Sequence, residues 1–121
     1  MKIKTLVVGS LSVGGLFMLL SACAPAMQET LKTCPATITA GVGGLIYAPA
    51  RCKLTLGGSS KTVVIQADKE HPFDTVSTNW PTAIMDAQTD QKITFKAPGT
   101  YTYKCHIHGI LGMGGSITVE N

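Results

Sequence analysis

Residues 104–113, with the sequence KCHIHGILGM, concentrate the side chains of this chain that can bind a soft metal ion. The 121-residue chain contains three His and four Cys, and two of these His and one Cys lie within these ten positions. Thiolate and thioether sulfurs are soft ligands, and imidazole nitrogen is a borderline one. The spacing of Cys105, His108 and Met113 therefore predicts a transition-metal site.

The types of these ligands indicate which metal the site would bind. Two His, one Cys and a weakly bound axial Met form the ligand set of electron-transfer copper sites. His71 is the one histidine outside the stretch and is predicted to be the second imidazole ligand. Met85 has no motif around it and is predicted to pack in the core or in a loop. We expect one copper ion with four ligands: His71, Cys105, His108 and Met113.

Two connections between strands would hold these ligands. Cys105 ends an alternating strand, His108 lies in the glycine-rich loop that follows, and Met113 stands just before the last strand. Glycine allows such a loop to turn tightly near a metal. His71 comes from a different connection, after the strand pattern KTVVIQA. A site held in this way at one end of a rigid domain changes little between Cu(I) and Cu(II), which favours fast electron transfer.

The supporting domain is predicted from short strand patterns separated by turns. The segments CKLTL, KTVVIQA, FDTVS, QKITFKA, TYTYKCH and GSITVE, with ATITAG as a candidate first strand, give about seven strands. GGSS and the pair Pro98-Gly99 mark turns, and residues 80–90 are predicted to form a loop or one short turn. We therefore expect residues 34–121 to form one all-β domain, an antiparallel β-sandwich.

The N-terminus carries the signals of export and anchoring. A basic start, MKIK, precedes an uncharged stretch over residues 5–20, which suits a signal peptide and is short for a membrane-spanning helix of ~20 residues. LSAC, residues 20–23, resembles a bacterial lipobox. The resemblance implies a lipoprotein signal peptide over residues 1–22, a lipidated Cys23 and a linker over residues 23–33. An uncleaved anchor with an incidental Cys is the alternative.

Export would place the domain outside the cytoplasm, on a periplasmic or cell-surface face. Loss of Lys2 and Lys4 with the signal peptide lowers the formal net charge from +3 to +1. No basic patch remains to predict nucleic-acid binding. We expect a monomer that is attached to the membrane through its lipid anchor.

Cys34 and Cys52 remain once Cys23 is assigned to lipid and Cys105 to metal. An exported protein can oxidise such a pair. A bridge over these 18 positions would stabilise the fold by roughly 3 kcal/mol in the chain-entropy model. Two buried free thiols are the alternative, because the sequence does not show that the two side chains meet.

Residues 99–121, GTYTYKCHIHGILGMGGSITVEN, resemble the C-terminal part of the cupredoxins, the plastocyanin and azurin family. The matching pattern is GxYxxxC followed by CxxHxxxxM. Upstream, IYAPARCKLTLGG and EHPFDTVS are similar to family segments, the second of which carries the first histidine ligand, here His71. The resemblance covers roughly residues 37–121. It implies a Greek-key β-sandwich, a type 1 copper ion and single-electron transfer between redox partner proteins.

The resemblance also implies roles for residues near the ligands. Tyr101 is expected to support the ligand loop from the strand below it. Gly109, Ile110 and Leu111 surround His108, the ligand that passes the electron in this family. If exposed, they form an apolar docking patch for a redox partner, but apolar loop residues are equally often buried in the core.

Two further positions are informative because they depart from the usual pattern. Pro72 follows the first histidine ligand, where many cupredoxins have a residue whose N–H donates to the cysteine sulfur; proline has no such N–H. A sulfur without this donor favours Cu(II), so we expect a lower reduction potential. His106 stands where the family has no ligand and is predicted to lie near the surface without binding the metal.

Other functions fit parts of the pattern. Multicopper oxidases also carry a Cys-His-Ile run, here Cys105-His106-Ile107, but three histidines cannot build their trinuclear centre. An autonomous enzyme is therefore not expected. A periplasmic copper carrier or buffer could use the same four ligands and is the alternative function. Colour distinguishes the two, because a thiolate–Cu(II) site absorbs strongly in the visible range and a Cu(I) carrier does not.

Overall fold

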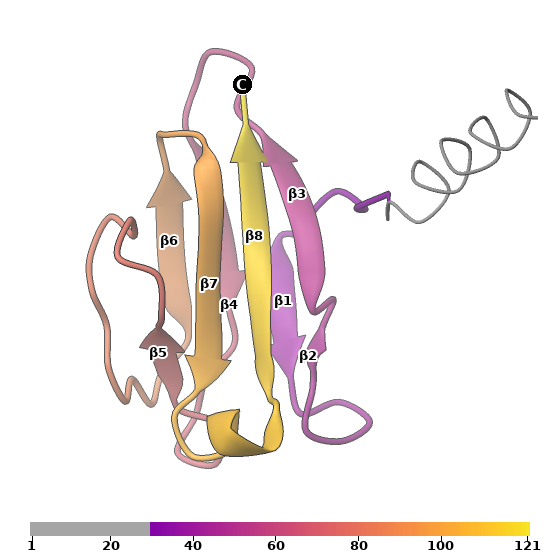
Figure 1. Ribbon diagram of the computed structural model, residues 1–121, viewed down its shortest axis with the longest axis vertical. Coiled ribbons are helices and arrows are strands. Elements are labelled where there is room, and N and C mark those ends of the chain that lie inside the picture. Colours follow the sequence, from indigo (N-terminus) through magenta and orange to yellow (C-terminus); the bar gives the residue numbers. More distant parts are fainter. Residues whose placement is uncertain (1–29) are drawn as a thin grey trace, which may run out of the picture. The chain divides into compact units, whose positions relative to one another are not determined.

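Residues 30–121 are described by the computed structural model, and they fold into two four-stranded sheets packed face to face (Figure 1). The front sheet contains, in spatial order, β3 (Arg51–Thr55), β8 (Gly114–Glu120), β7 (Gly99–Cys105) and β5 (Phe73–Thr75). The back sheet contains β2 (Tyr47–Ala48), β1 (Thr37–Ala40), β4 (Lys61–Ile65) and β6 (Gln91–Phe95). One 3₁₀ turn, η1 (Gly109–Leu111), lies between β7 and β8.

The all-β sandwich predicted from the sequence is confirmed, but its strand pairing is mixed. β1 runs parallel to β4, and β3 runs parallel to β8. The pairs β1–β2, β4–β6, β5–β7 and β7–β8 are antiparallel, as expected. The chain crosses between the sheets after β2, β3, β4, β5 and β6. These crossings bring distant strands side by side, and local sequence patterns do not record them.

Alternating side chains of facing strands fill the space between the sheets. In β7, Tyr101, Tyr103 and Cys105 are buried, while the residues between them are partly or fully exposed. Trp80 enters the core from the connection between β5 and β6, and its ring lies against those of Phe73 and Tyr101. The back sheet contributes further buried apolar side chains: Ile38, Val63, Ile65, Ile93 and Phe95.

The sequence patterns predicted every strand of residues 30–121 except β2, whose two residues are too few to show an alternation. The predicted loop over residues 80–90 is confirmed, with one isolated bridge from Ala87 to Phe73. Met85 lies in this loop with 78% of its surface exposed, so the structure places it in a loop and not in the core.

Cys34 and Cys52 form a disulfide, as predicted. The backbone beside it also pairs, because the Lys53 N–H donates to the carbonyl of Lys32 and the Cys34 N–H donates to that of Lys53. Pairing with the domain thus begins within the segment predicted as a linker. The predicted signal peptide, Cys23 and most of the linker lie outside the described residues. Within residues 30–121, no helix has the length and apolar character needed to cross a membrane.

One end of the sandwich collects the connections that carry the predicted ligands. In Figure 1, η1, the β1–β2 connection and the β4–β5 connection all lie at the lower end, where β7 also ends. The C-terminus lies at the opposite end. Residues that are 34 positions apart in the sequence, such as His71 and Cys105, can therefore meet at this end.

Candidate metal centre

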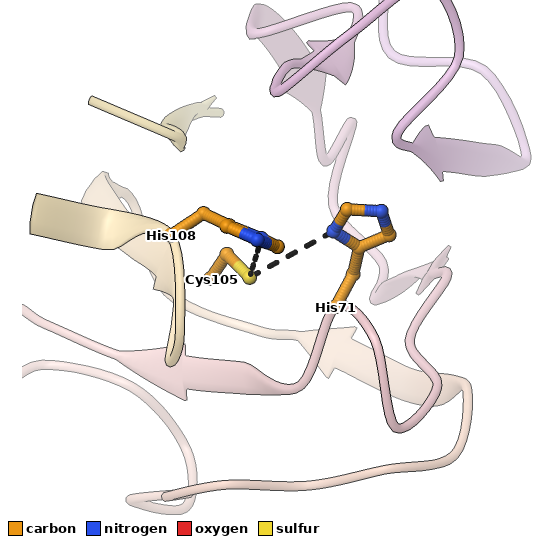
Figure 2. A group of neighbouring side chains, drawn as sticks. All are labelled: His71, Cys105 and His108. Atoms are coloured by element: carbon orange, nitrogen blue, oxygen red, sulfur yellow. Dashed lines mark hydrogen bonds between the residues drawn. The ribbon is translucent and has the colours of Figure 1, made fainter. Parts of the chain in front are cut away.

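His71, Cys105 and His108 lie together at the lower end of the sandwich. One ligand atom from each lies within 4.8 Å of the other two. Figure 2 shows both imidazole rings directed at the cysteine, with Nδ1 of His71 3.9 Å and Nδ1 of His108 3.5 Å from Sγ of Cys105. Cys105 is fully buried, whereas both histidines are partly exposed.

These distances fit a first-row transition-metal ion between the three donors. Bonds of ~2.3 Å to sulfur and ~2.0–2.1 Å to nitrogen, at angles between tetrahedral and trigonal, separate the two donor atoms by roughly 3.5–3.8 Å. The observed separations are 3.5 and 3.9 Å. One thiolate and two imidazoles are also the donors that copper prefers among biological ligands. The residues present therefore fit one copper ion.

The connection between β7 and β8 folds back on itself through backbone hydrogen bonds. The Cys105 N–H donates to the carbonyl of Met113 over 2.9 Å, and the Met113 N–H donates to that of His108 over 3.2 Å. The Gly112 N–H donates to the carbonyl of Gly109 over 3.0 Å. Gly112 itself has a φ of 96°, a left-handed conformation that favours glycine. Cys105, His108 and Met113 are consequently held close together by their own backbone.

Met113 is fully buried. Its backbone is hydrogen-bonded to two residues of the cluster, Cys105 and His108. A buried thioether next to a soft-metal site suits the weak axial ligand predicted for this position. Its role as a ligand stays a prediction. Met85 is exposed in the β5–β6 connection.

His71 is presented by a turn that Asp68 stabilises. Oδ1 of Asp68 accepts hydrogen bonds from the N–H groups of His71 (2.9 Å) and Glu70 (2.8 Å). These two bonds to the carboxylate lower the pKa of Asp68, because they favour its charged form. The backbone that carries His71 is therefore ordered before the ring meets any metal.

His106 does not join the cluster, although it is adjacent to Cys105. Its Nδ1 donates to the carboxylate of Asp74, at 2.9 and 3.0 Å from the two oxygens. Asp74 is only 5% exposed and also accepts the N–H of Asp86 at 2.7 Å. Lys104 approaches the same carboxylate at 4.0 Å. Asp74 was not predicted from the sequence. The signal that could have indicated it is the presence of an acidic residue in the middle of the short strand β5.

Pro72 lies next to His71 and is buried. Its carbonyl accepts the His106 N–H over 2.8 Å, so it ties the two ligand-bearing connections together. Having no N–H of its own, it cannot donate to the Cys105 sulfur. The effect on the reduction potential stays a prediction.

Tyr101 does not have the position that we expected for it. Its ring packs against those of Trp80 and Phe95, and its hydroxyl donates to the carbonyl of Ala97 over 2.6 Å. Tyr101 precedes Cys105 by four positions, which is ~13 Å along a strand. It therefore supports the turn between β6 and β7 at the other end of the domain, and not the ligand loop.

Two other tyrosine hydroxyls are buried near the site without a hydrogen-bond partner in the described part of the chain. They belong to Tyr47 and Tyr103, whose rings meet edge to face with centroids 4.8 Å apart. Burial is the main cause that raises the pKa of both hydroxyls, because it disfavours the charged phenolate. Both side chains are therefore neutral residues of the core.

Exposed apolar side chains lie in two of the connections at the end of the domain that holds the site. Ile110 is 93% exposed and Leu111 68% exposed, so these two residues lie at the surface and not in the core; Gly109 beside them is partly exposed. The β1–β2 connection at the same end adds further exposed apolar side chains that sequence reasoning missed: Val42, Leu45 and Ile46. We call the set of Val42, Leu45, Ile46, Ile110 and Leu111 the apolar end surface.

The fold and this cluster together define a copper-binding β-sandwich protein. A sequence profile described as copper binding proteins, plastocyanin/azurin family, matches residues 37–120. The chain therefore belongs to the plastocyanin/azurin family, the cupredoxins, and copper is its cofactor. A search of curated protein sequences finds no match.

Solved structures confirm the fold at low sequence identity. The chain is similar to pseudoazurin from Methylobacterium extorquens AM1, at 22% identity over 71% of this chain and 75% of that one, with a TM-score of 0.56. Pseudoazurin from Sinorhizobium meliloti matches at 24% identity over 70% and 72%, with a TM-score of 0.51. The copper-containing nitrite reductase from Thermus scotoductus SA-01 matches at 24% identity and a TM-score of 0.51, over 78% of this chain but 24% of the enzyme.

Proposed function

We propose that this protein is a type 1 copper electron-transfer protein that carries one electron at a time between redox partners outside the cytoplasm. The observation that carries the proposal is the convergence of one buried thiolate donor and two imidazole Nδ1 atoms from two separate connections. Copper bound there supplies the one-electron Cu(I)/Cu(II) couple, in which a reduced partner gives up one electron and an oxidised partner accepts it.

The protein residues would contribute rigidity and a defined exit for the electron. Cys105 is fixed at the end of β7 by its backbone bond to Met113, and the turn stabilised by Asp68 fixes His71. Ligands that are held this firmly rearrange little when the charge of the site changes. His108 is partly exposed at the base of η1, so it offers the short route from the site to a partner seated over Ile110.

The apolar end surface supports docking by brief apolar contact. Large exposed apolar side chains that cluster over a site mark interaction surfaces in soluble proteins. Small interfaces of this kind suit transient redox encounters. We propose that a donor and an acceptor protein use this surface in turn, and that the protein acts as a monomer without binding nucleic acid.

The location outside the cytoplasm is supported by two independent features. Cys34 and Cys52 form a disulfide. Disulfides persist in oxidising compartments and are rare in the cytosol. The lipobox-like LSAC sequence at residues 20–23 suggests a lipid on Cys23 and thus a membrane-attached protein. We propose a lipoprotein on the periplasmic or cell-surface face.

We propose no enzymatic activity for this chain by itself. The nitrite reductase that shares the fold is about four times as long as the matched region, so its activity is not carried over. His106, the histidine outside the cluster, is engaged with Asp74. Among residues 30–121, a second group of three metal-binding side chains is not found.

The test is the visible and electron paramagnetic resonance spectrum after Cu(II) is added. We expect an intense visible band and a narrow copper hyperfine splitting, both lost in Cys105→Ala. A colourless protein that still binds Cu(I) tightly would contradict electron transfer and support the copper carrier or buffer function. Retention of the band in Cys105→Ala would contradict the assignment of the thiolate.

A further inference from the structure

Gly41, the first residue of the β1–β2 connection, lies directly against the His71 ring. A side-chain carbon placed on Gly41 would fall 2.5 Å from Nε2 and 2.9 Å from Cδ2 of His71, well inside van der Waals contact. Figure 2 shows that the Nε2 edge of this ring points away from the cysteine, while Nδ1 faces Sγ. The backbone of Gly41 therefore lies next to the Nε2 end of the ring, which is the end farther from Sγ.

We propose that Gly41 is a positioning residue for the copper site. Its bare backbone packs against the Nε2 edge of His71 and keeps Nδ1 directed at Cys105. The inference rests on the proposed function, in which His71 binds copper. Hydrogen-bonding partners behind a metal ligand fix its ring orientation, and their loss commonly weakens metal binding; backbone packed on the ring restricts its orientation in the same way.

Hydrogen bonds hold Gly41 in this place from both sides. Its N–H donates to the carbonyl of Ile46 over 2.9 Å, which closes the β1–β2 connection. The Ala40 N–H donates to Oε1 of Gln66 over 2.9 Å. Gln66 directly follows β4, on the segment that leads to His71. The ends of β1 and β4, which lead to Gly41 and His71, are therefore tied together near the site.

Two separate reasons could require glycine at this position, and the chain offers a way to distinguish them. Gly41 has a φ of 79°, which other residues rarely adopt, and it also has no room for a side chain. Gly43 in the same connection has a φ of 81°, but a side-chain carbon there would meet nothing within 4 Å. Gly43→Ala thus carries the backbone strain without the contact to His71.

The first test compares Gly41→Ala with Gly43→Ala in the full chain. Both variants should lower the melting temperature through backbone strain, and Gly41→Ala should lower it further because of the added overlap with His71. Gly41→Ala alone should shift the His71 ring resonances of the metal-free protein and weaken Cu(I) binding by ~10–100-fold, measured by competition with a chromogenic chelator. Equal shifts and equal affinities in the two variants would overturn the inference.

A second test needs no variant and therefore does not depend on folding of Gly41→Ala. In the metal-free wild-type chain, the Gly41 Hα protons should show nuclear Overhauser contacts to the ring protons of His71. Absence of these contacts would overturn the inference. If they are observed while the copper-loaded protein lacks the thiolate band, the proposed function fails but the packing of Gly41 on His71 stands.

Discussion

At the scale of single residues, the site depends on which of two adjacent side chains faces the metal. Cys105 and His106 are neighbours in the sequence, yet Cys105 is buried within the cluster and His106 turns to Asp74. Successive side chains of an extended chain point to opposite faces, so Cys105, the last residue of β7, and His106, which follows it, point in different directions. The Cys-His-Ile run thus supplies one residue to the metal cluster, Cys105, while its histidine pairs with Asp74.

The two histidines that flank Ile107 should respond differently to removal. We expect His108→Ala to lose the intense visible band of the copper-loaded protein, because Nδ1 of His108 lies 3.5 Å from the thiolate sulfur. His106→Ala should keep the band, because its imidazole contacts Asp74. Absorption spectra of the two variants, loaded in parallel, provide the measurement. Loss of the band in His106→Ala would contradict this assignment.

Pro72 should lower the reduction potential of the site. Alanine at this position restores a backbone N–H that can donate to the sulfur, and a net hydrogen-bond energy of ~0.5–1.5 kcal/mol corresponds to ~20–60 mV for one electron. We therefore expect Pro72→Ala to raise the potential by this amount in a redox titration. Pro98→Ala, in the exposed turn between β6 and β7, is the matched control and should change nothing. An unchanged potential in Pro72→Ala would refute the idea.

At the scale of elements, β7 connects the two ends of the domain. Its inward-facing residues are Tyr101 near the upper turn, Tyr103 in the middle and Cys105 at the metal site. The three side chains share one face of one strand but have different polar surroundings. Tyr101 donates its hydroxyl to Ala97, whereas the hydroxyl of Tyr103 is buried without a partner.

Removal of these two hydroxyls should have opposite effects on stability. Tyr101→Phe leaves the Ala97 carbonyl without its donor and should cost ~1 kcal/mol, or a fall of ~4–8 °C in melting temperature. Tyr103→Phe removes an unsatisfied buried hydroxyl and should leave the melting temperature unchanged or raise it. Thermal unfolding of the metal-free variants decides the matter, and equal losses in both would contradict the assignment.

The disulfide should stabilise the domain by restraining the unfolded chain. Cys34 precedes β1 and Cys52 lies in β3, 18 positions later. We expect the double variant Cys34→Ala/Cys52→Ala to lose ~2–4 kcal/mol of unfolding free energy in urea titrations. Reduction of the wild-type disulfide should reproduce the loss. A loss well below 1 kcal/mol would show that the bond contributes little.

At the scale of the whole molecule, function depends on one end of the sandwich. The copper ligands, η1 and the β1–β2 connection share this end, while the C-terminus and the turn supported by Tyr101 lie at the other (Figure 1). A partner that approaches the apolar end surface would come close to His108. The same partner at the opposite end would be a strand length away from the metal.

Ile110→Asp should therefore slow electron transfer to a protein more than to a small oxidant. We expect the oxidation rate by cytochrome c to fall ~10-fold, equivalent to ~1.4 kcal/mol of contact energy, while oxidation by ferricyanide changes little. Val76→Asp, an exposed apolar position beside the middle of β7, should leave both rates unchanged. Equal slowing with both oxidants would indicate damage to the site and contradict the docking role.

The sequence by itself determined the class of the fold, most of the strands and the ligand types, and it predicted the pair Cys34–Cys52 without showing that the two side chains meet. Strand alternation is local, and the spacing of Cys105, His108 and Met113 lies within one connection, so both can be read along the chain. His71 was assigned by its order in the chain and by resemblance. Its meeting with Cys105 depends on the pairing of β5 with β7, which sets Phe73 opposite Cys105 although the two strands lie far apart in the sequence.

Only the tertiary structure decided the parallel pairs, the place of Tyr101, the Asp74–His106 pair and the contact of Gly41 with His71. Each joins residues from different elements, and no local pattern records which elements become neighbours. Crossing between the sheets brought β1 beside β4, and with it Gly41 beside the segment that carries His71. The donor atoms are thus specified by sequence, whereas the surroundings that hold and orient them arise from packing.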